Sequence, residues 1–195
     1  MGNKILNEVK VLGLTLLIIG VAFVGVNYQY FGAQVMYYIN RGGSDLEVME
    51  TRASNRIYIQ SLGIEAPLVY IDEIGEPIFQ DALAQGVVHY PGTAAIGHRG
   101  NAFFFGHSSD FPTKPGNYKT VFALLPHIEM GDEVVLTDKD GKVYRYQVFD
   151  THVVKPTDTQ WLNQETEGKS LLTLQTSYPV GTALQRFLVR AELVK

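Results

Sequence analysis

The 195-residue sequence contains no cysteine. Disulfide bonds and metal sites with thiolate ligands are therefore excluded. An excess of basic charge is also absent, because 16 Lys and Arg stand against 20 Asp and Glu for a net charge of -4. This balance argues against a nucleic-acid partner. The five histidines lack the short spacing of a zinc motif. We expect no metal and no cofactor. The histidines are His89, His98, His107, His127 and His152.

The N-terminal part of the chain carries one long apolar run. It has no charged residue from position 11 to position 26, and it extends with mostly apolar residues to position 31. About 20 such residues span a bilayer, and the tyrosines at its far end are typical of a membrane interface. Lys4 and Lys10 precede the run and favour a cytoplasmic N-terminus. The pattern predicts a transmembrane anchor over residues 11–31 after a short cytoplasmic segment, residues 1–10.

Two other interpretations of this run stay open. A cleavable signal peptide has a shorter apolar core that ends at small residues, and none is well placed after Val26. A buried core helix is the second alternative, although this run is apolar on all sides. With an anchor, we expect a polar stalk over residues 32–55 and one domain over residues 56–195. That domain would lie outside the cytoplasm, on a single-pass protein of the cell membrane.

The apolar pattern after residue 55 is that of strands. The run at 102–105 is continuously apolar, as in a strand buried on both faces. Asp140-Gly141 lies between two alternating runs, which is the signature of a hairpin. Helical periodicity is brief, at 79–85 and 120–125. Strands are predicted at 57–59, 66–71, 102–105, 133–137, 142–149, 171–176 and 186–193. Many short strands predict a mostly β fold, either a barrel or a sandwich.

Three reactive side chains stand at the ends of predicted strands. His107 follows the apolar strand 102–105, Ser177 follows the strand 171–176, and Arg186 opens the last strand. Polar groups at such ends are held rigidly and still reach solvent, which is the usual setting of catalytic groups. Each one alone is more often a cap, a turn residue or a surface charge. The combination of all three is more specific.

Together with these residues, a series of motifs resembles the sortases, transpeptidases that attach proteins to bacterial envelopes. The motif TLQTS matches the family pattern Thr-Leu-x-Thr-Cys, with Ser177 in place of the cysteine. The motifs lie at 62–67 (LGIEAP), 86–93 (GVVHYPGT), 100–101 (GN), 106–107 (GH), 131–132 (GD) and 173–177 (TLQTS). His98-Arg99 is a weaker candidate for the family's histidine motif, because GN and the apolar strand come after it. The resemblance implies a closed, sortase-like β-barrel with a few short helices.

The resemblance also implies the roles of the site residues. Ser177 would take the position of the cysteine nucleophile, His107 that of the catalytic histidine, and Arg186 that of the catalytic arginine. Thr176 and Trp161 would contact substrate, although Trp161 could equally cover the core. The family cleaves Leu-Pro-x-Thr-Gly-like sorting signals on surface proteins. It transfers the acyl group to an amine of the cell envelope or of a pilin.

Serine at position 177 predicts little or no turnover. An alkoxide is harder to form than a thiolate, so a serine nucleophile needs a base that a third group orients. The family has no carboxylate dedicated to this task, and a contact of Asp110 with His107 is not expected. The serine is either a deliberate replacement or a natural one. A natural serine leaves two alternatives, a slow serine acyltransferase or a pseudoenzyme that binds sorting signals.

Two features bear on the substrate groove. Residues 41–56 contain no aromatic residue, so we expect no aromatic lid of the kind found in pilus-assembling sortases. The loop 155–169 carries several carboxylates that could bind calcium, but a solvated loop is the more common case.

The competing functional class is a membrane-tethered binding or assembly module without catalysis. It would leave His107, Ser177 and Arg186 dispersed over the surface.

Overall fold

The computed structural model of the chain describes residues 2–26, 28, 30–32, 34–35, 53–111 and 113–194. The predicted stalk at 32–55 lies mostly outside these residues. Most of the segment 41–56, where we expect no aromatic lid, is outside them too. The expectations for the stalk and the lid therefore stay predictions.

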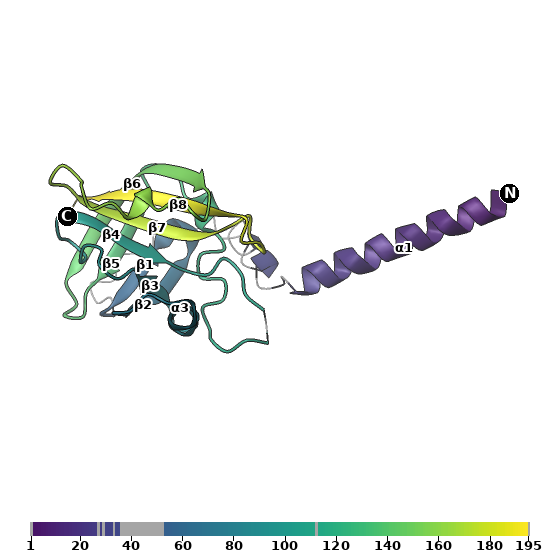
Figure 1. Ribbon diagram of the computed structural model, residues 1–195, viewed down its shortest axis with the longest axis horizontal. Helices are drawn as coiled ribbons and strands as arrows, with labels where there is room; N and C mark the ends of the chain where they lie inside the picture. Colours follow the sequence, from purple (N-terminus) through teal and green to yellow (C-terminus); the bar gives the residue numbers. More distant parts are fainter. Residues whose placement is uncertain are drawn as a thin grey trace.

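Helix α1 (Gly2–Val26) projects away from the rest of the molecule (Figure 1). Its window Asn7–Gly25 has a mean hydropathy of 2.0, and none of this window is buried. A helix that is apolar all round is suited to a nonpolar environment rather than to water. The helix is therefore long and apolar enough to cross a membrane. It begins nine residues before Val11, inside the segment predicted to be a short N-terminus.

The strands close into a barrel, which confirms the predicted fold class. Within the described residues, the order around the barrel is β1-β2-β3-β4-β7-β8-β6-β5. Neighbouring strands are antiparallel except for β2 with β3 and β4 with β7. The strands are β1 (Arg56–Ile59), β2 (Ile64–Tyr70), β3 (Val87–His89), β4 (Gly100–Phe105), β5 (Glu133–Thr137), β6 (Val143–Val154), β7 (Ser170–Tyr178) and β8 (Gln185–Leu193).

The barrel interior is filled by aliphatic and aromatic side chains from all strands. Strand β4 is buried along almost its whole length, as its continuous apolar sequence predicts. Asp140-Gly141 lies in the turn between β5 and β6, and these two strands pair antiparallel. The predicted hairpin is therefore confirmed. The largest fully buried residues are Tyr146, Phe104, Phe122, Ile57, Ile59, Leu125, Leu136, Leu172, Leu174 and Leu188.

The short helices differ partly from the predictions. The predicted helix at 79–85 is α3 (Glu76–Leu83), which begins earlier with a proline in its first turn. The predicted helix at 120–125 is wrong, because these residues form turns that lead into η2 (Leu125–His127). The N–H of Phe122 donates a hydrogen bond to the carbonyl of His107 at 2.9 Å, so it is not available to a helix. Pro126 cannot donate a helical hydrogen bond. Strand β3 was not predicted, since three residues are too few for a pattern.

One buried histidine makes the stability of the barrel dependent on pH. His89 on β3 is 9% exposed and packs against the rings of Tyr70 and Phe104, with ring centres 5.3 and 4.9 Å away. Its Nε2 lies 3.0 Å from the Ala94 carbonyl oxygen and 3.1 Å from Thr93 Oγ1. Burial lowers the pKa of His89 below its ordinary value of 6.5, and the bond to Ala94 only partly opposes this.

We predict that the barrel loses stability as the pH falls below about 6.5. The unfolded chain takes up a proton there, whereas the folded chain resists protonation of His89 until a lower pH. The loss of stability is therefore absent above pH 6.5 and grows as the pH falls further below it. His89→Gln should make the urea midpoint of the full chain in detergent micelles less dependent on pH between 5 and 7.

The control is His98→Gln, which removes an exposed histidine. It should keep the native pH profile. His107 has a lowered pKa as well, so His89→Gln removes only part of the dependence. An unchanged slope in the His89 variant would contradict the prediction.

Candidate active site

Strand register brings the three predicted site residues to one end of the barrel. In the parallel pair β4–β7, Phe105 lies opposite Gln175. His107 and Ser177 each follow two residues later, His107 just past the end of β4 and Ser177 still inside β7, so both lie at the same end of the barrel. In the antiparallel pair β7–β8, Ser177 lies opposite Arg186. Three neighbouring strands therefore present a histidine, a serine and an arginine side by side.

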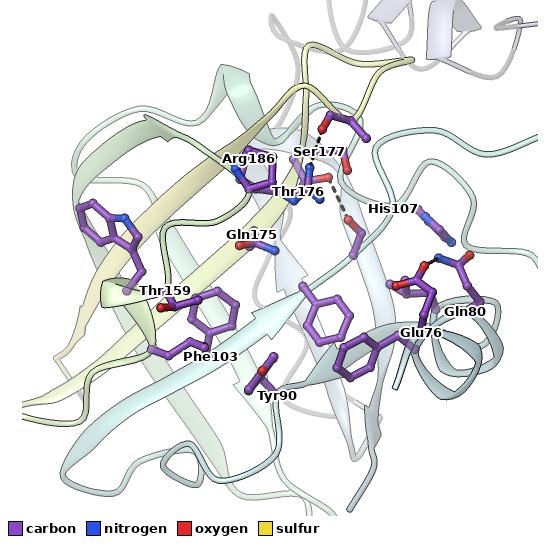
Figure 2. Close-up of a pocket in the computed structure, with 18 of the residues that line it drawn as sticks. Glu76, Gln80, Tyr90, Phe103, His107, Thr159, Gln175, Thr176, Ser177 and Arg186 are labelled. Atoms are coloured by element: carbon purple, nitrogen blue, oxygen red, sulfur yellow. Dashed lines mark hydrogen bonds between the residues drawn. The ribbon is translucent and has the colours of Figure 1, made fainter. Parts of the chain in front are cut away.

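These residues line one cavity of about 480 Å³. Figure 2 shows Ser177 and Arg186 together, with His107 on the other side of Ser177. Thr176, Trp161 and the helix α3 residues Glu76 and Gln80 line the same cavity. A cleft of this volume is large enough for several side chains of a peptide. His107, Ser177 and Arg186 are not dispersed over the surface, as the competing class would require.

The backbone around His107 is fixed from both sides. Before it, the N–H of Gly106 donates to the Gln175 carbonyl at 3.0 Å, and Thr176 Oγ1 donates to the Gly106 carbonyl at 2.9 Å. After it, the His107 carbonyl accepts from Phe122. A Cβ at Gly106 would come within 2.8 Å of the Phe122 ring, so the loop passes too close for a side chain. Thr176 is only 2% exposed, and its hydroxyl serves this attachment.

Burial and neighbouring charges act on both cationic residues of the site. Burial lowers the pKa of His107, the Asp110 carboxylate raises it, and Lys114 lowers it again. Burial also lowers the pKa of Arg186, and the carboxylate of Glu76 opposes this shift. Arg186 remains a cation at neutral pH. Its Nη1 donates to the carbonyls of Ala183 at 3.1 Å and Gln185 at 3.0 Å.

Asp110 approaches His107 more closely than expected. Its Oδ2 lies 3.7 Å from Nε2 of His107, which is an ion-pair distance but longer than a hydrogen bond. A serine hydrolase would need a hydrogen bond from the histidine to a carboxylate. That bond is not formed at this distance.

Trp161 forms one wall of the cavity. It lies in η3 (Gln160–Leu162), in the loop between β6 and β7. Its ring stacks on His152, with ring centres 4.4 Å apart, and the Arg190 guanidinium lies 5.9 Å from the ring centre. Trp161 therefore packs on barrel side chains and also borders the cavity. Contact with a substrate stays a prediction.

The amide side chains of Gln164 and Asn101 attach the η3 loop to the barrel. Gln164 Oε1 accepts the N–H groups of Ala94 at 3.0 Å and Asn101 at 3.1 Å. Its Nε2 donates to the carbonyls of Asn101 at 3.1 Å and Leu162 at 2.8 Å. Asn101 Nδ2 adds a bond to the Trp161 carbonyl at 2.7 Å. These bonds set the position of the wall that Trp161 forms.

Sequence reasoning missed several residues of the cavity. Glu76 and Asp110 line it from other segments, and Gln164, which is not part of the lining, acts through the loop that carries Trp161. Asp110 lies three positions after His107, which was the one available signal. No group of three or more His, Asp or Glu residues that could hold a metal occurs within the described ranges.

Comparison with known proteins decides the family. A family model for the sortase domain matches residues 57–194. The chain belongs to the sortase family. It is therefore a member of a family of transpeptidases. A search of the curated proteins found no match.

Solved structures of sortases share this fold. Sortase C-1 from Actinomyces oris is 26% identical, with a TM-score of 0.59 over 84% of this chain and 83% of that chain. Sortase C1 from Streptococcus agalactiae is 27% identical, with a TM-score of 0.59 over 78% and 72%. Sortase E from Streptomyces avermitilis is 26% identical, with a TM-score of 0.57 over 74% and 91%.

We predict that Gln164→Ala destabilises this sortase by about 1–3 kcal/mol, because it removes four hydrogen bonds to partly buried backbone groups. Gln160→Ala is the matched control. Gln160 lies in the same loop, but its side chain is exposed and bonds only to Asp158. Its replacement should cost no more than about 0.5 kcal/mol. Urea unfolding of the two variants checks this, and equal stabilities would contradict it.

Proposed function

We propose that this chain is built as a membrane-anchored transpeptidase that cleaves a Leu-Pro-x-Thr-Gly-like sorting signal. The observation that carries the proposal is the convergence of His107, Ser177 and Arg186 at one cavity. Helix α1 would serve as the single-pass anchor, with the barrel outside the cytoplasm. The substrates would be surface proteins that bear sorting signals. The acceptor would be an amine of the cell envelope or of a pilin.

The proposed reaction assigns one task to each residue. With cysteine in place of Ser177, a thiolate at this position would attack the carbonyl carbon of the threonine, and the carbonyl oxygen would become an oxyanion. Arg186 stabilises this charge with its fixed fork of N–H donors. His107 protonates the departing amine as the C–N bond breaks. An acceptor amine then attacks the acyl-enzyme, its proton passes to the now neutral His107, and the C–S bond breaks to release the thiolate.

The position of Arg186 supports this assignment. It lies directly opposite position 177 across the β7–β8 pair, within reach of an oxyanion formed there. Its guanidinium is bound only to the backbone carbonyls of Ala183 and Gln185 among the partners described. None of the described carboxylates forms an ion pair with it, so within this part of the chain its positive charge is not neutralised directly.

The loop between β6 and β7 would form the substrate-facing wall. Trp161 borders the cavity, and the stack with His152 and Arg190 holds its ring. An aromatic wall of this kind suits the apolar residues of a sorting signal. Thr176 would contact the substrate mainly through its own backbone groups, because its hydroxyl already donates to the Gly106 carbonyl.

Ser177 limits the activity of this chain. A serine hydroxyl ionises far less readily than a thiol, and proton removal by His107 would need a firmly oriented imidazole. We therefore propose that the Ser177 form turns over little or not at all. The intact cavity favours a second candidate function, in which the same chain binds sorting-signal peptides without cleaving them.

We predict that Ser177→Cys raises cleavage of an LPxTG-type peptide, with amine transfer, by at least about 100-fold over the native chain. The reason is that a thiol ionises far more readily than a serine hydroxyl. This thiol would be the only one in the chain and would lie opposite Arg186. The measurement is product formation by the full chain in micelles, with varied peptides and a glycine-based acceptor amine.

Ser170→Cys is the matched control, because it introduces a single thiol at the other end of the same strand. It should stay inactive. His107→Ala or Arg186→Ala added to Ser177→Cys should remove the gain. Inactivity of Ser177→Cys on all peptides would argue against the transpeptidase. Equal cleavage rates for the Ser177 chain and for Ser177→Cys would contradict the argument that a serine hydroxyl ionises too poorly to act as the nucleophile.

A further inference from the structure

A carboxylate folds back on His107 from the turn that follows it. Asp110 Oδ2 lies 3.7 Å from His107 Nε2, and the two side chains are only 11% and 15% exposed. Both line the same cavity as Ser177 and Arg186. A half-buried imidazole beside a mostly buried carboxylate differs from a surface ion pair, because solvent screens it less.

Asp110 is itself held in one orientation. Its Oδ1 accepts the N–H of Phe111 at 2.8 Å and the ammonium of Lys114 at 2.8 Å. The other oxygen, Oδ2, is the one that faces His107. Burial raises the pKa of Asp110, but the bonds from Lys114 and Phe111 outweigh it and keep the pKa below its ordinary value. The carboxylate is therefore ionised at neutral pH.

The charges around His107 act in opposite directions. Burial disfavours the imidazolium and lowers the pKa of His107. Asp110 favours the imidazolium, and so does the more distant Glu76 at the start of α3. Lys114 disfavours it. The proton-donating form of His107 therefore depends on the balance between one adjacent carboxylate and the lysine that is bonded to it.

We propose that Asp110 is a positioning residue for His107, which it orients through Nε2, and that Lys114 moderates its effect. The proposal rests on the proposed function, in which His107 protonates the leaving amine. With Nε2 turned to Asp110, Nδ1 is the nitrogen left to exchange a proton with the substrate. Hydrogen bonds of catalytic groups are often long before substrate binds and shorten in the complex. A shift of less than 1 Å would bring 3.7 Å into hydrogen-bond range.

The same contact bears on Ser177. A serine nucleophile needs a base oriented by a third group, and Asp110 is placed to be that group. The long distance and the lysine on the other oxygen keep its effect weak. Any residual acyl transfer by the Ser177 form would therefore depend on Asp110.

The first test needs no substrate. The resonance of His107 is followed by NMR against pH in the full Ser177 chain in micelles, and it is assigned by its loss in His107→Gln. Asp110→Asn keeps the shape of the side chain and should lower the pKa of His107. Glu76→Gln should lower it less. Lys114→Met should raise it, because it removes a positive charge and frees Asp110.

Opposite signs for Asp110→Asn and Lys114→Met support the proposal, since a merely structural role would not produce them. An unchanged His107 titration in Asp110→Asn overturns it, and so do shifts of the same sign in both variants. Circular dichroism confirms that each variant is folded. Asp110→Glu, which restores the charge, should bring the titration back towards the native curve.

The second test uses the Ser177→Cys form and an LPxTG-type peptide. Asp110→Asn should lower kcat by about 10- to 100-fold, as expected when a proton donor is misplaced, with little change in KM. Asp110→Glu should restore part of kcat. An unchanged kcat overturns the positioning role. If Ser177→Cys cleaves no peptide, the proposed function fails, and the NMR titration still decides whether Asp110 controls His107.

Discussion

The parallel pairing of β4 with β7 sets where every other part of the site must lie. Residues 100–105 run beside residues 170–175, so the residues that follow in each segment lie at the same end of the barrel. His107 and Ser177 therefore become neighbours although 70 positions separate them in the sequence. Strand β8 returns antiparallel to β7 and adds Arg186 opposite Ser177. A shift of one residue in either pair would turn these side chains to the other face of the sheet.

Partial burial then determines how these groups behave. Because the cavity removes His107 and Arg186 from bulk water, burial lowers the pKa of both. Carboxylates at the rim oppose this effect, Glu76 on both residues and Asp110 on His107. Charged groups in such a cavity act more strongly than they would on the surface, and this favours stabilisation of a developing oxyanion. The loop with Trp161, which Gln164 attaches to the barrel, bounds the same space.

The sequence predicts much of the fold, because period-2 patterns and turn residues act locally. The strand at 133–137 and the Asp140-Gly141 hairpin are examples. Helix 120–125 was wrong, since the hydrogen bond from Phe122 to His107 is a tertiary contact that no local pattern contains. His107, Ser177 and Arg186 were predicted from strand ends and from family motifs. Glu76, which lines the same cavity, and Gln164, which fixes the loop of Trp161, were not, because only folding brings their segments there.

The central claim is that residue 177 is the position at which an acyl group is transferred. Intact-mass spectrometry of the Ser177→Cys form, quenched during turnover of an LPxTG-type peptide, tests it most directly. The account predicts a mass increase equal to the peptide fragment that ends at threonine. The adduct should map to residue 177 and disappear when the acceptor amine is added. It should not form when His107→Ala is combined with Ser177→Cys. Product formation without an adduct, or an adduct at another residue, would contradict the account.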